Sequence, residues 1–399
     1  MSKARELAEL GAVYNSDALS NRNLIINGEM QCWQRATAAT AANNSYNTVD
    51  RFRAYLNGGA YTTEKSTDNP DGTGNGSSLK CQVTTADTSI AAGEYAFINH
   101  EIEAQNLQHL QYGTSSARNV TLSFWVKSNK TGTYTVGVFK HANGATAYMY
   151  RKEYTIDAAD TWEKKEFTIS PTAGSTTFMT SSGGAINNNN GNGFGVSFNL
   201  MLGSNFHGTN DAWAADAKYG TSNQVNWMDS TSNNFYITQI QMEVGESATP
   251  FEHRSLGDEL LRCQRYFYNP MSGGSATPAE INFTANVNYG TLVAGTNVGH
   301  FAFEVPFPVT MRAVPTLTHD ISNSDFAGGS APSGSQVSFY YQNQGYTDEA
   351  GNGNLNTLAR HAASNSGCMV GTYYISPSNV RYDQFIIGAS KQFHFSAEL

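Results

Sequence analysis

The chain has 399 residues, and only 14% of them are charged, well below the roughly 25% of an ordinary soluble domain. Its net charge is −9 and its Lys and Arg residues form no basic stripe, which argues against nucleic-acid binding. Aromatic residues make up 12% of the chain, so we expect a folded protein with an uncharged polar surface rather than a disordered one.

The four cysteines lie far apart without a C-x-x-C pair, and each is expected to be a small buried residue. No run approaches the roughly 18–20 apolar residues of a membrane span, and the N-terminus lacks the apolar segment of a signal peptide. We therefore expect that the protein is made in a cytoplasm and that it does not insert into a membrane.

Residues 3–13 are predicted to form a short helix. Leu7, Leu10 and Val13 supply its apolar positions. Because an isolated helix shorter than about 12–15 residues is marginal in water, it requires a surface to dock on. That surface is either the rest of the chain or a larger assembly, and residues 1–22 are interpreted as an N-terminal anchor.

From residue 23 the pattern changes to the alternation of half-buried strands, seen in residues 120–127, 194–202 and 235–245. The predicted core positions are Val120, Leu122, Phe124, Val126, Phe194, Val196, Phe198, Leu200, Leu202, Tyr236, Ile240, Met242 and Val244. Long loops rich in Gly, Asn, Ser and Thr separate the strands. We predict an all-β fold in which residues 23–254 form a jelly-roll β-sandwich.

A helix pattern follows at residues 255–270, where Ser255 can cap the helix and Pro270 ends it. Its single apolar face is formed by Leu256, Leu260, Cys263 and Phe267. We predict a connector helix whose apolar face meets two further copies at a threefold axis, or packs beneath the next domain.

Residues 271–399 are predicted to form a second β-sandwich. Residues 301–311 alternate most clearly, with Pro306 and Pro308 on the face opposite the apolar side chains. Because proline cannot donate to a β-ladder, this strand is predicted at a sheet edge.

Enzyme and metal signatures are absent from the sequence. The chain lacks the H-E-x-x-H, G-x-S-x-G and phosphate-loop patterns, and its nine histidines show no metal-ligand spacing. Residues 71–76 resemble the start of a calcium loop, but Gln82 stands where the bidentate acid is required, so a polar turn is preferred. We expect a non-enzymatic protein without metal or cofactor.

Sugar recognition requires apolar ring faces beside amide and hydroxyl groups. Residues 203–234 combine two tryptophans with many Asn, Ser and Thr residues. The predicted glycan-binding residues are Trp213, Trp227, Asn226, Asp229, Tyr340 and Tyr346. The alternative for Trp213 and Trp227 is that they cap the end of the sandwich. Trp33, Trp125 and Trp162 are interpreted as packing residues.

Four segments carry a resemblance to a known family: residues 21–35, 48–54, 241–267 and 393–399. They read NRNLIINGEMQCWQR, TVDRFRA, QMEVGESATPFEHRSLGDELLRCQRYF and FHFSAEL. With these segments the chain resembles tail-fibre or receptor-binding proteins of tailed bacteriophages, especially marine ones of the cyanophage kind, which carry a carbohydrate-binding-like jelly roll. The resemblance covers residues 20–268. Ala36 replaces the usual glycine after the Gln34-Arg35 pair, so that turn is expected to differ.

The resemblance implies a virion component made in a host cytoplasm, forming a homotrimer that attaches to host surface glycans. Its N-terminus is expected to bind other virion proteins of the tail or capsid. The family motifs look structural, and Arg51 or Arg254 is expected to pair with Glu243 or Glu252. Two other functions remain open. One is a structural virion protein, such as a head decoration, that braces neighbouring subunits. The other is a polysaccharide-degrading enzyme.

Overall fold

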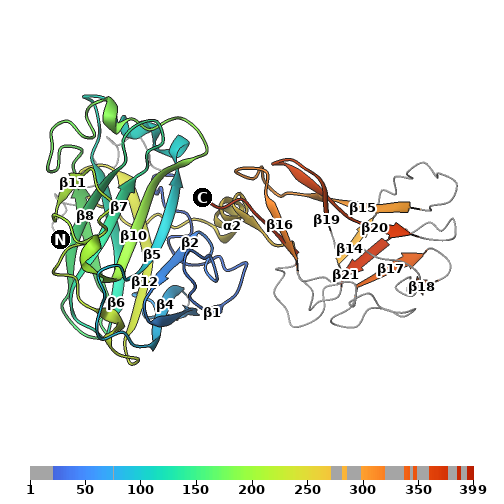
Figure 1. Cartoon of the computed structure of the whole chain (residues 1–399), viewed down its shortest axis with the longest axis horizontal. Coiled ribbons are helices and arrows are strands. Elements are labelled where there is room, and N and C mark those ends of the chain that lie inside the picture. The colour runs from blue at the N-terminus through green and yellow to red at the C-terminus, as the bar shows by residue number, and fades with distance from the viewer. Residues whose placement is uncertain are drawn as a thin grey trace. The chain divides into compact units, whose positions relative to one another are not determined.

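The computed structural model describes residues 21–74, 76–270, 281–284, 298–319, 337–341, 345–347, 359–375, 384–387 and 393–399. The predicted N-terminal helix with Leu7, Leu10 and Val13 lies outside these ranges. The chain divides into two compact units, one that runs to Cys263 and includes Leu399, and one formed by Gln264–Glu398. Figure 1 shows the elements of both units.

The first unit is a β-sandwich of two six-stranded antiparallel sheets. Sheet A contains, in order, β1 (Ala38–Thr40), β3 (Ala60–Ser66), β4 (Ser78–Thr85), β12 (Asn234–Val244), β6 (Val120–Ser128) and β9 (Glu163–Ile169). Sheet B contains β11 (Ala212–Ala214), β8 (Tyr148–Ile156), β7 (Gly132–Lys140), β10 (Asn192–Leu202), β5 (Tyr95–Glu103) and β2 (Phe52–Asn57). The chain passes repeatedly between the sheets, as in a jelly roll. The connections carry 3₁₀ turns η1 (Ala104–Leu110), η2 (Ser182–Gly184), η3 (Ser204–Phe206) and η4 (Trp227–Asp229).

The core lies between the two sheets and is filled by alternate side chains of their strands. Strand β6 contributes Val120, Leu122, Phe124 and Val126, all at most 1% exposed. The ring of Phe124 meets that of Phe198 on the opposite sheet, with centroids 5.1 Å apart and an edge-to-face angle. Each such side chain contributes about 1.5–3 kcal/mol when it leaves water. The predicted all-β sandwich is confirmed.

In strand β12, the side chains that face the core are not all the predicted ones. Phe235, Ile237, Ile240 and Met242 are fully buried, whereas Tyr236 is only half-buried. The pairing of β12 with β6 shifts between Thr238 and Gln241, and Gln239 has a φ of +50°. This β-bulge reverses the side of the following residues, which simple alternation cannot anticipate.

Residues 21–35 pack against residues 240–242, where the 241–267 segment begins. The side chain of Asn23 donates to the carbonyl of Ile240 at 3.0 Å. At Gly28, an added Cβ would lie 2.1 Å from the same carbonyl oxygen, so only glycine fits there. Residues more than 200 positions apart in sequence are thus joined through backbone groups.

The predicted charge pairs of this region are partly as expected. Arg254 pairs with Glu252 at 3.1 Å. Arg51, in contrast, is fully buried and donates to the backbone carbonyl of Glu101 at 2.7 Å. Glu243 faces Arg22 at 3.6 Å, which is a long ion pair.

Helix α2 is formed by Leu256–Gln264 and begins as predicted, since the backbone N–H of Asp258 donates to the Ser255 hydroxyl at 3.1 Å. It is shorter than the predicted residues 255–270. Phe267 belongs instead to a strand, where it pairs with Ser396 of β22 (Phe393–Ser396).

The buried side of α2 agrees only in part with the predicted apolar face, since Cys263 is buried as predicted but Leu256 and Leu260 are not. Glu259 and Cys263 are its buried residues, while Leu256 is 57% exposed and Leu260 half-buried. The Glu259 carboxylate accepts a hydrogen bond from the backbone N–H of Asn27 and lies 3.4 Å from Arg254. Polar contacts with residues 23–27 decide which side of the helix faces the rest of the unit. Helical periodicity alone does not predict such contacts.

The second unit is also built from antiparallel strands, in three small sheets. The first contains β13 (Phe267–Tyr268), β22 and β16 (Thr316–His319). The second contains β14 (Ile281–Thr284), β21 (Gln384–Ile387), β17 (Val337–Tyr341) and β18 (Gly345–Thr347). The third contains β15 (Val298–Pro306), β20 (Gly367–Ile375) and β19 (Ala359–Ala363).

Strand β15 lies at the edge of its sheet among the described strands, as its prolines predict. It ends at Pro306 rather than continuing to residue 311. Phe307 and Met311 are nevertheless buried, and the ring of Phe307 contacts that of Phe395 at 4.9 Å. No helix in the described ranges is long and apolar enough to span a membrane.

Candidate functional site

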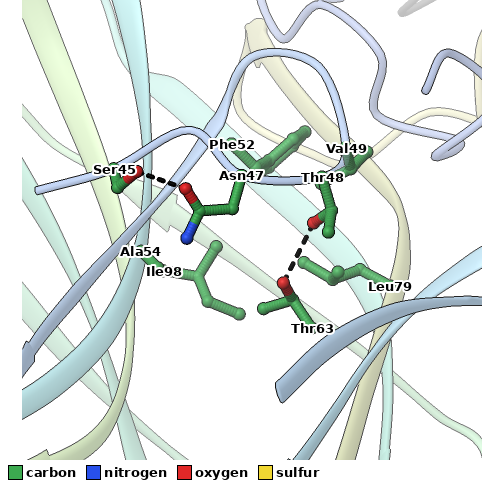
Figure 2. Close-up of a pocket in the computed structure, with 9 residues that line it drawn as sticks. All are labelled: Ser45, Asn47, Thr48, Val49, Phe52, Ala54, Thr63, Leu79 and Ile98. Carbon is green, nitrogen blue, oxygen red and sulfur yellow. Dashed lines mark hydrogen bonds between the residues drawn. The ribbon is translucent and has the colours of Figure 1, made fainter. Parts of the chain in front are cut away.

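A small recess opens between the two sheets of the first unit, beside β2, the edge strand of sheet B. Figure 2 shows its lining, which includes Phe52 and Ala54 of β2 and Leu79 of β4. Two threonines of the lining, Thr48 and Thr63, hydrogen-bond to each other at 3.0 Å. The recess has room for about one water molecule, so it is too small to hold a sugar ring.

Two of the predicted glycan-binding residues lie in the core. Trp213 is 2% exposed and Trp227 is fully buried. Their indole N–H groups donate to the carbonyls of Ser170 at 3.0 Å and Asn234 at 3.1 Å. The rings have no face open to a ligand, so their assignment to a glycan-binding surface is corrected. The alternative, that they pack the end of the sandwich, agrees with this placement.

The predicted polar partners of the tryptophans have structural contacts. The Asn226 side chain accepts from the backbone N–H of Met228 and donates to the carbonyl of Asp87 at 2.7 Å. Asp229 pairs with Lys130 at 2.5 Å. Both therefore hold the η4 turn in place.

The two predicted tyrosines of the second unit are brought together by strand pairing. Tyr340 of β17 lies opposite Tyr346 of β18 in an antiparallel ladder. Their assignment to glycan binding stays a prediction.

The outer face of sheet B carries a different group of residues. In β5, Ala96 and Ile98 point into the core, so Tyr95, Phe97, Asn99 and Glu101 stand on the outer face. Strand β2 lies beside β5 (Figure 1). In the register of the two strands, Arg53 lies opposite Asn99 and Tyr55 opposite Phe97. This surface, the sheet-B face, consists of Arg53, Tyr55, Tyr95, Phe97, Asn99, Glu101, His141 and Tyr219.

Three aromatic rings of the sheet-B face form a stacked row. The centroids of Tyr55 and Phe97 are 4.7 Å apart at an interplanar angle of 18°. Phe97 and Tyr219 follow at 5.0 Å and 21°. Because Phe97 is covered on both sides, the row offers solvent its ring edges and the hydroxyl ends of Tyr55 and Tyr219. Neither hydroxyl has a hydrogen-bond partner among the described residues.

Both tyrosines remain proton donors at neutral pH. Burial raises the pKa of Tyr55, and the nearby Arg53 opposes this shift only in part. Burial raises the pKa of Tyr219 to about 12, with further contributions from the neighbouring Tyr55 and Glu101. The two hydroxyls can therefore donate hydrogen bonds to a ligand oxygen throughout the physiological range.

A charged cluster lies beside the aromatic row. The guanidinium of Arg53 lies 3.3 Å from one carboxylate oxygen of Glu101, to which Asn99 also donates at 2.8 Å. His141 Nε2 lies 2.8 Å from the other oxygen. An added Cβ at Gly195 would lie 3.2 Å from this carboxylate, so the glycine leaves it room.

The guanidinium of Arg53 is also held between two aromatic rings. It lies 4.9 Å from the centroid of Tyr55 and 5.2 Å from that of Tyr46. The Nε–H of Arg53 is buried and has no hydrogen-bond partner, so one donor of this guanidinium is unused. The neighbouring side chains fix its position.

The connection between β10 and β12 covers the other half of the outer face. The Asn199 amide donates to the carbonyl of Tyr219 at 2.9 Å, and Gln224 donates back to the carbonyl of Asn199 at 3.2 Å. Beneath this connection, Ser197 Oγ and Asn199 Oδ1 are buried without partners. The less covered part of the face therefore lies over β2, where Arg53 and Tyr55 are half-buried, and Tyr219 forms its border. The β5 residues Phe97, Asn99 and Glu101 are themselves at most 5% exposed.

This face is not among the sites predicted from the sequence. A signal was present, because residues 95–101 place two aromatics, an amide and a carboxylate on alternate positions opposite Ala96 and Ile98. Tyr219 could not have been found in this way, since it comes from a loop more than 100 residues away.

The face offers hydrogen-bond donors beside aromatic ring edges, and its charged cluster contains one carboxylate, that of Glu101. In the described ranges, no group of three or more His, Cys, Asp or Glu side chains is arranged to hold a metal ion.

No family model matches the chain, and no curated protein does. A similar solved structure is the enzymatically active domain of tailspike protein 4 of bacteriophage CBA120, with 12% identity over 56% of this chain and a TM-score of 0.29. The match covers 21% of that tailspike chain.

Two others are a family 11 carbohydrate-binding module from Clostridium thermocellum and the baseplate tripod of bacteriophage Tuc2009. The module is 13% identical over 54% of this chain and 98% of its own, with a TM-score of 0.26. The tripod is 10% identical over 71% and 83%, with a TM-score of 0.23. Similarities this low support no inference about function.

The fold and the site together define a class. The protein is an all-β protein whose first unit is a jelly-roll β-sandwich, with a partly open polar and aromatic face on sheet B.

Proposed function

We propose that the chain is a non-enzymatic virion protein of a tailed bacteriophage, a tail-fibre or receptor-binding protein that attaches to host surface glycans. Two observations support it. The sequence segments 21–35 and 241–267 resemble those of such proteins. The sheet-B face also supplies groups that hold sugar hydroxyls, and this face carries the proposal.

The sugar is proposed to lie across β2 and β5, against the edge of the stacked row. The hydroxyls of Tyr55 and Tyr219 donate to its oxygens, and Arg53 adds a donor. Glu101 is buried and positions Arg53 and His141 rather than contacting the sugar itself. Because Arg53 is positioned by two rings and a carboxylate, little conformational entropy is lost on binding.

The test is binding of the full-length chain to host cells and to purified lipopolysaccharide. Tyr55→Ala and Arg53→Ala are expected to weaken binding about tenfold or more, as expected for the loss of one well-formed polar contact. Thr84→Ala, at an exposed position of β4 in sheet A, is the matched control. Equal binding by all four proteins would contradict the proposed site.

The alternative function is that of a structural virion protein that braces its neighbours. It predicts a chain that binds particles but neither cells nor glycans. Removal of residues 1–20 tests the anchor common to both functions, and is expected to release a folded chain from particles. An enzyme, in contrast, would release reducing sugar from host polysaccharide, and we expect none.

The chain is further proposed to form a homotrimer. On α2, Leu256 is 57% and Leu261 43% exposed, and the proposed contact between copies is made through this helix.

A further inference from the structure

The five tryptophans differ in whether their indole N–H groups are used. Those of Trp33, Trp162, Trp213 and Trp227 each donate to an oxygen of the chain. The Trp125 side chain has neither a hydrogen bond nor a ring contact to any described residue, and Trp125 is half-buried. Its neighbours in β6, Phe124 and Val126, are in the core, so Trp125 stands on the outer face of sheet A. This corrects its interpretation as a packing residue.

Polar side chains surround Trp125. In the strand register it lies opposite Thr238 of β12 and Lys164 of β9. Two residues along β6, the Lys127 ammonium lies 4.4 Å from the ring centroid of Tyr236 and 5.3 Å from that of Trp162. A single unpartnered ring therefore lies among donors and two further aromatic side chains.

One lysine of this face, Lys164, is only loosely neutralised. It pairs with Glu166 at 3.0 Å, but the two side chains are 38% and 56% exposed. An exposed pair of this kind contributes about 0–1 kcal/mol, so a ligand hydroxyl can replace the Glu166 carboxylate at little cost. Lys127, in contrast, is 10% exposed and donates to Asp68, which also accepts from Trp162. On the sheet-B face, in contrast, the carboxylate of Glu101 is 5% exposed and fixed.

We propose that Trp125 and the surrounding outer face of sheet A form a second sugar-binding site, which takes one ring of a neutral oligosaccharide. The indole face provides the apolar surface for sugar C–H groups, and the indole N–H and the Lys164 ammonium donate to its hydroxyls. A protein partner fits less well, because the cores of protein interfaces are depleted of Lys and Glu, which surround Trp125.

This site is independent of the one on sheet B. Trp125 and Tyr55 stand on the outer faces of opposite sheets of one sandwich, so one sugar ring cannot contact both. A chain with two weak sites for the same polymer gains avidity without any new contact. The inference goes beyond the proposed function, and the two can fail separately.

The experiment observes the five indole N–H signals of the full-length chain labelled with ¹⁵N-tryptophan. Trp125→Phe identifies the signal of residue 125. Maltohexaose, cellohexaose and mannohexaose are then titrated as neutral probes. We expect at least one of them to shift the Trp125 signal in a saturable way. Lys164→Ala, which leaves the indole in place, is expected to weaken that saturation about tenfold.

Trp125→Ala should abolish the second of two binding events measured by calorimetry, whereas Tyr55→Ala should leave the Trp125 signal and its saturation unchanged. Unchanged thermal midpoints serve as the control for folding. The proposal is overturned if no probe shifts the Trp125 signal, or if Lys164→Ala titrates as the unmodified chain does. A shift that depends on protein concentration alone would also overturn it, because it indicates contact between copies of the chain.

Discussion

Replacement of Trp227 by alanine separates a core residue from a ligand-binding one. The ring is fully buried, meets Tyr61 edge-to-face at 5.9 Å, and donates its N–H to Asn234. Truncation of a buried aromatic side chain costs about 3–5 kcal/mol, because the transfer energy is lost and a cavity remains. In a domain of this size, that corresponds to a fall of roughly 6–20 °C in the midpoint of thermal unfolding.

The assay is calorimetric unfolding of the full-length chain, followed by glycan binding measured well below the transition. We expect Trp227→Ala to lower the unfolding temperature of the sandwich while the folded protein binds with unchanged affinity. Trp125→Ala should have the opposite effects: glycan binding becomes weaker, while the unfolding temperature changes little. The reasoning is refuted if Trp227→Ala unfolds within about 1 kcal/mol of the unmodified chain, since a fully buried ring cannot be removed so cheaply.

Three further predictions concern other parts of the structure. Gly28→Ala should destabilise the sandwich by about 1–3 kcal/mol or more, because the new methyl group meets the Ile240 carbonyl. Gly257→Ala in α2, with nothing closer than 4.0 Å, is its control and should stabilise slightly in denaturant unfolding. Burial lowers the pKa of Lys140 to about 8, below its ordinary value of 10.5. The unfolded chain then binds more protons between these pH values, so stability should rise from pH 8 to 10.5, and Lys140→Met should remove that rise. Leu256→Asp should dissociate the oligomer, and an unchanged mass in sedimentation would count against a contact at α2.

The sequence predicted those features that depend on local pattern. Alternation in residues 120–127 places Val120, Leu122, Phe124 and Val126 correctly in the core. The start of α2 follows from the hydrogen bond between Ser255 and Asp258, three residues apart. Both patterns repeat over a few residues and are fixed by backbone geometry, so they need no knowledge of distant contacts.

The same patterns failed where a distant segment intervenes. A bulge at Gln239 turns Tyr236 away from the core, and Glu259 rather than Leu260 anchors α2 because Asn27 provides a backbone N–H for its carboxylate. Composition drew attention to Trp213 and Trp227 because they lie among polar residues. Their rings nevertheless fold inward, since each finds an acceptor for its N–H inside the sandwich.

The amino-acid sequence by itself determined that the chain is all-β, where some of its strands lie, such as that of residues 120–127, and where its one strong helix pattern starts. Which aromatic side chains are covered and which face solvent was decided only by tertiary structure. The side chains of a strand point alternately to its two sides. Which side is buried depends on the other segments of the chain that pack against it. Tyr219 reaches Phe97 from a loop, whereas no described ring or hydrogen-bond partner reaches Trp125.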